Sequence, residues 1–327
     1  MIQYFLSVSK TSALAGIFLA LVAVSLAVSA QPTGRIFITN EKDHSVSVIN
    51  GATLEVEGKI AIGKRPRGIG ISPDGAEVYV AISEDDAIAV FDPKTLKVLR
   101  KFQSGSDPET FAVHPNGNLY ISNEDDAKTS VYDPRTGELI TDIQVGLEPE
   151  GVAVSADGKK VVVTSESSNM LHVITVPGNT VIDNILVGSR PRAAIFNRNN
   201  QLIYATTEIS GEVIKIDAEQ ATILQRIQLK DPNSKPKDIL LSKDEKFLYV
   251  AGGRANKIWL MNADTLEVIK GISVGKRVWG LALSKDGSRL FTTNGVSNNV
   301  SVIDTAKNEV IKTIEVGKFP WGIAIDD

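Results

Sequence analysis

Short runs of alternating apolar and polar residues, separated by turns rich in proline, aspartate and glycine, follow one another from residue 34 to the end of the chain. In residues 64–105 these runs cover 68–71, 78–80, 87–91 and 98–102. The turns Ser-Pro-Asp-Gly and Asp-Pro-Lys-Thr lie between the first and second runs and between the third and fourth. Alternation with a period of two, broken at such turns, predicts four antiparallel strands.

This four-strand unit repeats along the chain. Each unit ends at a Val-Gly-like step, whose last residue is Gly63, Gly105, Gly146, Gly188, Lys230, Gly275 or Gly317. The resulting units are 64–105, 106–146, 147–188, 189–230, 231–275 and 276–317; five have 41 or 42 residues, and 231–275 has 45. The fourth unit is the least regular, because Asn197-Arg198-Asn199-Asn200 replaces its Asp-Gly turn. Four-stranded units of this length are typical of β-propeller blades.

The two ends of the repeat region complete one more blade. Residues 34–63 hold only three expected strands, at 35–40, 45–50 and 56–62, and residues 320–325 form a lone first strand. An open solenoid is the competing architecture, but a ring closed by these two ends leaves no exposed sheet edge there. We therefore expect an all-β fold, in which residues 31–327 form a single seven-bladed β-propeller of four-stranded antiparallel blades, closed by a blade shared between the N- and C-terminal strands.

The first 30 residues have a different pattern. Lys10 is their only charge, residues 11–28 are almost unbroken apolar sequence, and Val28-Ser29-Ala30 places small residues before Gln31. This pattern predicts a signal peptide, residues 1–30, cleaved after Ala30, and therefore a periplasmic protein. A retained N-terminal anchor is the alternative, because the apolar stretch is near the length that spans a bilayer.

Composition excludes several classes of function. The chain has no cysteine, so disulfides, thiolate catalysis and cysteine-ligated metals are absent. Without the leader, 34 basic and 39 acidic residues give a net charge of −5, which does not favour nucleic acid. His44, His114 and His172 fall at three different repeat positions, which argues against a histidine metal centre. No Ser-His-Asp set or phosphate-binding glycine loop is evident, and we predict no catalytic residue, metal or cofactor.

Three tetrapeptides indicate a family. The segments Phe37-Ile38-Thr39-Asn40, Tyr120-Ile121-Ser122-Asn123 and Phe291-Thr292-Thr293-Asn294 resemble the motif that names the YVTN-family propeller repeat. The Val-Gly-x-x-Pro-x-Gly pattern at the start of the units is similar to that family too, and the resemblance covers residues 34–327. The whole chain also resembles a narrower group, the seven-repeat exported propellers associated with PQQ-dependent alcohol catabolism, whose members accompany a transport operon and quinoprotein alcohol oxidation.

One loop position varies in a way that predicts a binding site. The loops that lead into the first strands point at the central channel, where propellers usually bind ligands. The residues after the proline of these loops, or at the equivalent position, are Arg67, Glu109, Glu150, Arg192, Lys237, Trp279 and Trp321. We expect them to bind a ligand or a partner, with the tryptophans as a wall for a flat ligand and Arg192 and Lys237 as a clamp for a carboxylate or phosphate. The alternative is a set of solvated loop charges, with tryptophans that cap the core.

A second recurring position is acidic. Glu41, Glu84, Glu124, Glu166 and Glu208 follow the second strand in five blades. Clustered carboxylates suit calcium, but the spacing is unlike an EF-hand, and solvated loop tips are the favoured interpretation.

These observations leave two functions open. The first is a non-enzymatic binding or scaffold propeller that serves quinoprotein alcohol catabolism, monomeric, with a quinoprotein dehydrogenase, a transporter component or a small molecule as its partner. The second is a lactonase-like hydrolase with its site at the same channel mouth. A PQQ dehydrogenase is disfavoured, because those enzymes typically have eight blades and tryptophan docking motifs, and many carry a vicinal disulfide.

Overall fold

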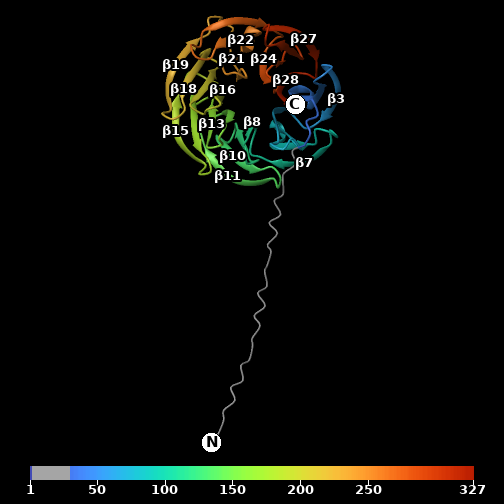
Figure 1. Ribbon diagram of the computed structural model, residues 1–327, viewed down its shortest axis with the longest axis vertical. Helices are drawn as coiled ribbons and strands as arrows, with labels where there is room; N and C mark the ends of the chain where they lie inside the picture. Colours follow the sequence, from blue (N-terminus) through green and yellow to red (C-terminus); the bar gives the residue numbers. More distant parts are fainter. Residues whose placement is uncertain (2–29) are drawn as a thin grey trace.

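The computed structural model describes Met1 and residues 30–327, so the expected signal peptide lies, apart from its two ends, outside the described residues. Seven four-stranded antiparallel sheets surround a central axis (Figure 1). The predicted seven-bladed β-propeller is therefore confirmed. None of the helices in the described part of the chain is long and apolar enough to cross a membrane.

The blades are numbered here along the chain, and each is given from its innermost to its outermost strand. Blade 1 contains β4 (Pro66–Ile71), β5 (Val78–Ile82), β6 (Ala87–Phe91) and β7 (Val98–Gln103). Blade 2 contains β8 (Pro108–Val113), β9 (Leu119–Asn123), β10 (Lys128–Asp133) and β11 (Glu138–Gln144). Blade 3 contains β12 (Pro149–Val154), β13 (Lys160–Ser165), β14 (Met170–Thr175) and β15 (Thr180–Leu186). Blade 4 contains β16 (Pro191–Phe196), β17 (Leu202–Thr207), β18 (Glu212–Asp217) and β19 (Thr222–Gln228).

The remaining three blades follow the same order. Blade 5 contains β20 (Ile239–Leu241), β21 (Phe247–Ala251), β22 (Lys257–Asn262) and β23 (Val268–Ser273). Blade 6 contains β24 (Val278–Leu283), β25 (Arg289–Asn294), β26 (Asn299–Asp304) and β27 (Glu309–Glu315). Blade 7 contains β28 (Pro320–Asp326), β1 (Arg35–Asn40), β2 (Ser45–Asn50) and β3 (Glu55–Ala61).

The ring closes as the two chain ends predict. In blade 7, β28 pairs with β1 in a register that sets Arg35 opposite Asp326. Beyond the ladder, the backbone N–H of Thr33 donates to the Asp326 carboxylate at 2.8 Å, and that of Gly34 donates to its carbonyl at 2.8 Å. These bonds join residues almost 300 positions apart, so the last strand and the first are held as one sheet.

The unusual fourth and fifth repeats are accommodated differently. In blade 4 the Asn-rich turn closes normally, with the Asn200 N–H donating to the Asn197 carbonyl at 2.9 Å and Asn200 at a φ of +62°, where blades 1, 2, 3 and 6 use glycine and blade 5 uses Glu245. Asparagine tolerates this left-handed conformation better than most residues, so the blade is regular. The irregular blade is the fifth, whose innermost strand β20 has only three residues.

The core lies between neighbouring blades. Strands β1, β5 and β6 have almost entirely buried side chains, whereas the outermost strands alternate between exposed and partly buried residues. Between blades 7 and 1, for example, Phe37 meets Phe91 edge to face, with ring centroids 5.2 Å apart. Each blade thus buries both faces against its two neighbours, which is why the single repeat is stable only within the ring.

The Asn of the tetrapeptide and the Gly of the Val-Gly step fit together. The Asn294 amide donates to the Ser301 hydroxyl at 2.9 Å and lies against Gly275, where an added Cβ would come within 2.7 Å of it. Asn40 with Gly317 and Asn123 with Gly105 repeat this contact. The two sequence signatures of the repeat are therefore two sides of one close approach between adjacent blades.

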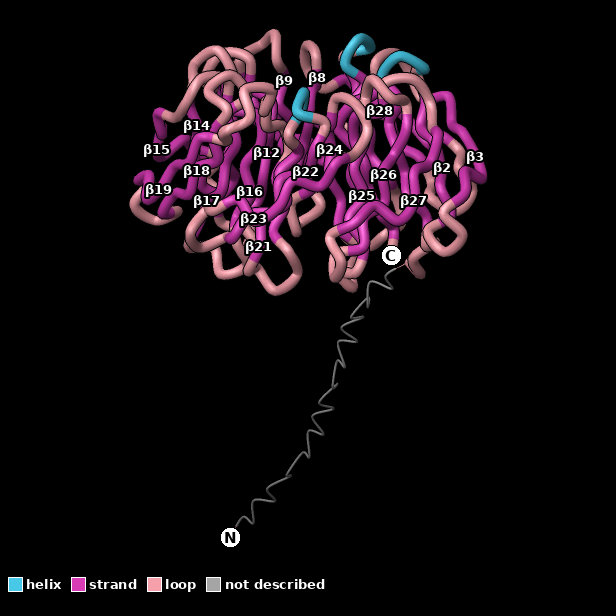
Figure 2. Tube along the Cα trace, turned by 90° about the horizontal axis from the view of Figure 1, so that it is seen from above, coloured by secondary structure: helices cyan, strands magenta, loops and turns pink. Residues whose placement is uncertain are grey.

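The two faces of the disc differ. Three short 3-10 helices, η1 (Glu41–Asp43), η2 (Ser83–Asp85) and η3 (Gly253–Ala255), lie on the face that carries the loops into the first strands (Figure 2). We call this the mouth face. The C-terminus lies on the opposite face, as does Ala30, whose N–H donates to the Asp74 carbonyl in the first turn of blade 1 at 2.7 Å.

Candidate functional site

Hydroxyl bridges between blades fix the backbone of the predicted mouth residues. A serine or threonine in the second strand of one blade donates to the carbonyl of the mouth residue in the next blade. The bridges are Thr39 to Arg67 (2.7 Å), Ser122 to Glu150 (2.6 Å), Thr164 to Arg192 (3.2 Å), Thr206 to Lys237 (2.8 Å) and Thr293 to Trp321 (2.7 Å). This hydroxyl is the third residue of the tetrapeptide, so the repeat motif itself positions the variable residues.

Left-handed residues precede the first strands, and three of them, Arg65, Arg190 and Arg277, line the outer chamber described below. The residue before the first strand has a φ between +48° and +61° at Arg65, Asp107, Glu148, Arg190, Arg277 and Phe319. Loop side chains of the preceding blade hold this conformation by accepting its N–H, as Asn256 does for Arg277 at 2.9 Å and Asn298 does for Phe319 at 3.0 Å. The strain of a positive φ is thus offset by a hydrogen bond at the place where the chain turns into the channel.

Six of the seven predicted residues line two adjacent cavities in the channel. The outer chamber, about 190 Å³, opens on the mouth face and is lined by Arg65, Arg67, Glu124, Glu150, Arg190, Arg192, Glu208, Lys237, Arg254, Arg277 and Trp279. The inner chamber, about 160 Å³, is lined by Thr110, Glu150, Gly151, Val152, Arg192, Ala193, Ala194, Lys237, Asp238, Trp279, Gly280 and Trp321. Four residues are common to both, so the two chambers are adjacent in the channel. Glu109 lines neither chamber.

Most of the charges at the mouth form ion pairs. Glu109 is fully buried and pairs with Arg67, and a second Glu109 oxygen lies 3.6 Å from Arg65. Arg65 pairs in turn with Asp107 at 2.9 Å and with Glu41 at 3.4 Å. The charges on this side of the mouth therefore compensate one another in ion pairs. Glu109 holds Arg67 in place and is not open to a ligand.

The second arc has the same character. Arg192 pairs with Glu150 at 2.6 Å and with Glu166, and all three side chains are buried. Lys237 pairs with Glu208 at 2.7 Å. Burial lowers the pKa of Lys237 well below its usual value and nearby Arg192 adds to this shift, while Glu208 opposes it. Although burial opposes it, Lys237 and Arg192 hold the pKa of Glu208 below its usual value, as a buried ion pair requires.

Glu166 and Glu208 correct the expectation of solvated acidic loops. Both are buried, because the loop after the second strand curls over the channel and meets the arginines of the next blade. Glu84 is exposed, and its predicted equivalence is wrong. The residue that occupies the position in blade 1 is Ser83, whose N–H donates to the carbonyl of left-handed Arg65 as the N–H of Glu124 does to Asp107.

The two tryptophans form one wall of the inner chamber, as predicted. Their ring centroids lie 6.1 Å apart with planes tilted by 30°, so they contact one another and leave no slot between them. Cations surround Trp279, with the Lys237 Nζ 4.2 Å and the Arg277 guanidinium 4.8 Å from its ring centroid. Both indole N–H groups are buried and lack an acceptor in the described part of the chain.

Two cations at the mouth have no anionic partner. Among residues 30–327, neither Arg254 nor Arg277 has a carboxylate within ion-pair distance, although both line the outer chamber. Burial lowers the pKa of Arg277, and the neighbouring Arg254 and Arg192 add to this effect against Glu208. The side of the mouth nearest Trp279 therefore has an excess of positive charge.

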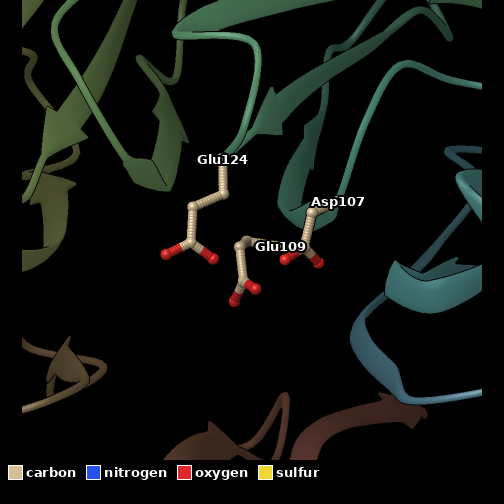
Figure 3. Close-up of side chains that lie close together, drawn as sticks. All are labelled: Asp107, Glu109 and Glu124. Carbon is tan, nitrogen blue, oxygen red and sulfur yellow. The ribbon is translucent and has the colours of Figure 1, made fainter.

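An acidic group lies on the other side. Asp107 and Glu109 at the start of β8 and Glu124 after β9 turn their carboxylates toward one another (Figure 3). One carboxylate oxygen of each residue lies within 4.8 Å of the other two. Burial raises the pKa of Glu124, and the charges of Glu150 and Asp107 raise it further. Since Arg65 and Arg67 already compensate Asp107 and Glu109, the arrangement is a mixed ion-pair network and not a set of free cation ligands.

Sequence reasoning missed Asp238, which is one of the residues that line the inner chamber. It accepts the N–H of Ile239 and the N–H of Leu281 in blade 6, both at 2.8 Å. Burial raises its pKa to about 6, while these two hydrogen bonds oppose the shift. A signal was present, because the equivalent residues of the other blades are uncharged: Gly68, Thr110, Gly151, Ala193, Gly280 and Gly322.

The histidines have structural contacts. His44 accepts the Arg65 N–H at 3.1 Å, a His114 ring nitrogen lies 2.7 Å from the Gly158 carbonyl, and His172 accepts the Gly146 N–H at 2.9 Å. Each contact joins two blades or two loops, which explains three histidines at three unrelated repeat positions.

Comparison with known proteins points to the same fold. A family model for YNCE-like β-propellers matches residues 6–132, and one for seven-bladed β-propeller lactonases matches residues 179–313. No curated protein matches the chain.

Several solved structures are similar over most of their length. Hydrazine synthase of Kuenenia stuttgartiensis has a TM-score of 0.78 at 20% identity, over 89% of this chain and 99% of that one. A putative 6-phosphogluconolactonase of Bacteroides uniformis has 0.74 at 19%, over 89% and 98%. The dihydro-heme d1 dehydrogenase NirN, solved in complex with DHE, has 0.67 at 16%, over 90% and 76%. Such low identities establish shared architecture alone, and the chain is a seven-bladed β-propeller of four-stranded antiparallel blades.

Proposed function

We propose that this protein is an exported, non-enzymatic binding propeller whose channel mouth takes a small anionic ligand, with a carboxylate as the recognised group. The observation that supports this most directly is the pair of arginines, Arg254 and Arg277, that line the outer chamber without a carboxylate partner. Arg254 is exposed and Arg277 is half-buried, so an anionic ligand at the mouth would meet two cations whose charge no carboxylate of the described residues compensates. Arg277 also recognises planar carboxylates better than a lysine would, since its donors form a fork.

The indole N–H groups of Trp279 and Trp321 add a second line of support. Buried polar groups normally have a partner, and two donors without one lie beside the same cavity system. Ligand oxygens, or waters held in place of a ligand, satisfy such donors. The excess of donors over acceptors on this side of the channel therefore favours a ligand rich in oxygen acceptors.

The resemblance to the exported propellers associated with PQQ-dependent alcohol catabolism supplies the proposed setting, quinoprotein alcohol catabolism in the periplasm. Oxidation of alcohols through aldehydes ends in carboxylates, which agrees with the proposed ligand class. A quinoprotein dehydrogenase or a transporter component is the proposed protein partner. N-terminal sequencing of the exported protein tests the setting: a mature chain that starts at Gln31 supports it, and retention of the first 30 residues contradicts it.

A lactonase-like hydrolase is the second candidate, because the lactonase family model matches residues 179–313. The ion pairs disfavour it. Glu150 lines both chambers but is paired with Arg192, and Glu109 is paired with Arg67 and lines neither chamber, so neither carboxylate is placed as a free general base. Turnover of a lactone panel that disappears in Glu150→Gln would establish the hydrolase and refute the non-enzymatic function.

Fluorescence titration tests the proposed function. Trp279 and Trp321 report occupancy, and the purified protein is titrated with acetate, propionate and succinate against the matched neutral amides. We expect saturable changes with the acids alone and a loss of about tenfold in affinity in Arg277→Gln, because one charge-assisted hydrogen bond disappears. Arg135→Gln, an exposed arginine on the opposite face, is the matched control. Equal responses to acids and amides, or full affinity in Arg277→Gln, contradict the proposal.

A further inference from the structure

Asp238 is the one residue of the inner ring with a carboxylate. In the other six blades the residue directly after the mouth residue is glycine, alanine or threonine. Such small or neutral residues line the axis where the seven blades converge. A carboxylate at this depth is costly to bury, and burial raises its pKa to about 6. Its presence in one blade out of seven is not explained by packing.

Two backbone hydrogen bonds use part of the acceptor capacity of the Asp238 carboxylate. The hydroxyl of the inter-blade bridge is missing in blade 5, where Ala251 occupies the position that Thr206 has in blade 4. Asp238 links blades 5 and 6 instead, by accepting the Leu281 N–H. The Ile239 N–H occupies a second lone pair. A carboxylate has about four such sites, so acceptor capacity remains on the side that faces the inner chamber.

No cation compensates Asp238. Within the described residues no lysine or arginine lies within ion-pair distance of it, although Lys237 is its neighbour in sequence and lines the same chamber. Lys237 is held by Glu208, and Arg192 is held by Glu150 and Glu166. The inner chamber is therefore lined by a carboxylate, Asp238, that has no cationic partner among the described residues, whereas the outer chamber is lined by Arg254 and Arg277, which have no carboxylate partner there.

The cations of the outer chamber and the carboxylate of the inner chamber together indicate which chemical groups the ligand carries. We infer that the mouth takes a small hydroxycarboxylate, bound with its carboxylate outward on Arg277 and Arg254 and its hydroxyl inward on Asp238. The inference rests on the proposed function and specifies its substrate class. The shared lining of the two chambers, which includes Trp279, gives a single molecule access to both ends.

An amino acid fits the same polarity less well. Its ammonium group would approach Asp238 past Lys237 and Arg192, which line both chambers, and like charges at this distance in a poorly solvated site repel strongly. A hydroxyl is neutral and donates to a carboxylate without this repulsion. The volume of the inner chamber, about 160 Å³, suits a group of this small size.

Three isosteric ligands test the inference on the full protein: lactate, propionate and alanine, which carry a hydroxyl, a hydrogen and an ammonium group at the same carbon. We expect lactate to bind about tenfold more tightly than propionate by calorimetry at pH 7.5, as a hydrogen bond to a charged group provides, and more tightly than alanine. In Asp238→Ala the advantage of lactate over propionate should disappear, while propionate retains its affinity within about twofold. The wild-type comparison stands even where the variant fails to fold.

The possible outcomes separate this inference from the proposed function. Equal binding of lactate and propionate to the wild-type protein overturns the hydroxyl contact but leaves anion binding at the mouth intact. An advantage of lactate that persists in Asp238→Ala also overturns it, because the hydroxyl then has another partner. Tighter binding of alanine overturns the preference for a neutral donor. Where none of the three binds, the proposed function fails and the inference fails with it.

Discussion

Thr293 gives a sharp test of how the mouth is positioned. Its hydroxyl accepts the Gly280 N–H at 2.9 Å and donates to the Trp321 carbonyl at 2.7 Å, so one oxygen atom links two blades. Thr293→Val keeps the shape of the side chain and removes both bonds. The neighbouring Thr292 is equally buried, but its hydroxyl has no hydrogen-bond partner in the described part of the chain. Thr292→Val is therefore a matched control.

The magnitude follows from these contacts. Each hydrogen bond contributes about 1 kcal/mol net, and a buried N–H or C=O left unpaired adds to the loss, so Thr293→Val should lower the free energy of unfolding by about 2–3 kcal/mol. Thr292→Val removes a buried, unpaired polar atom and should be neutral or stabilising, since an unpaired hydroxyl is unfavourable in the core.

Equilibrium urea unfolding, followed by circular dichroism, measures both variants. We expect the midpoint of Thr293→Val to fall at an unchanged m-value, and tryptophan emission of the native protein to shift because the backbone of Trp321 is released. Equal destabilisation by the two variants would refute the reasoning, because it would mean that side-chain chemistry in β25, and not the bridge, determines the effect.

Three further predictions concern the channel and the blade contacts. Asp238 has a folded-state pKa of about 6 against 3.8 for the free group, so its ionisation should lower the free energy of unfolding by about 3 kcal/mol as pH rises from about 4 to about 6. Urea unfolding at a series of pH values measures this dependence, and Asp238→Asn should remove it. Arg192→Met leaves Glu150 buried without its counter-ion and should lower the free energy of unfolding by about 3 kcal/mol in urea unfolding; an unchanged midpoint would contradict the ion pair. Gly275→Ala sets a Cβ within 2.7 Å of Asn294 and should cost about 1–3 kcal/mol, of which a second change, Asn294→Ala, should restore a part.

The architecture was predictable because it depends on local signals repeated many times. Alternation and turn residues place strands such as 35–40, 45–50 and 87–91 at their observed bounds. The same reasoning could align the seven mouth residues, since one hydroxyl of the repeat fixes the backbone of five of them.

The electrostatics of the mouth were not predictable from one repeat position at a time. Arg192 meets Glu150, Glu166 and Glu208, which come from strands and loops of two blades, and the ring curvature decides these partners. Repeat alignment also failed at Glu84, where a shift of one residue moves the side chain from the channel to solvent. Asp238 was visible as an exception among small residues, but its hydrogen bond from the Leu281 N–H depends on the close approach of β20 and β24.

The hydrogen bond of Ala30 determines on which face of the disc the described chain begins. Its hydrogen bond to Asp74 and the position of the C-terminus place Ala30 and the C-terminus on the face opposite the channel mouth (Figure 2). A surface attached at Ala30 itself would therefore contact the face opposite the open chamber. Immobilisation at this residue should leave ligand binding unhindered, and the immobilised form would present its cationic rim to freely diffusing molecules.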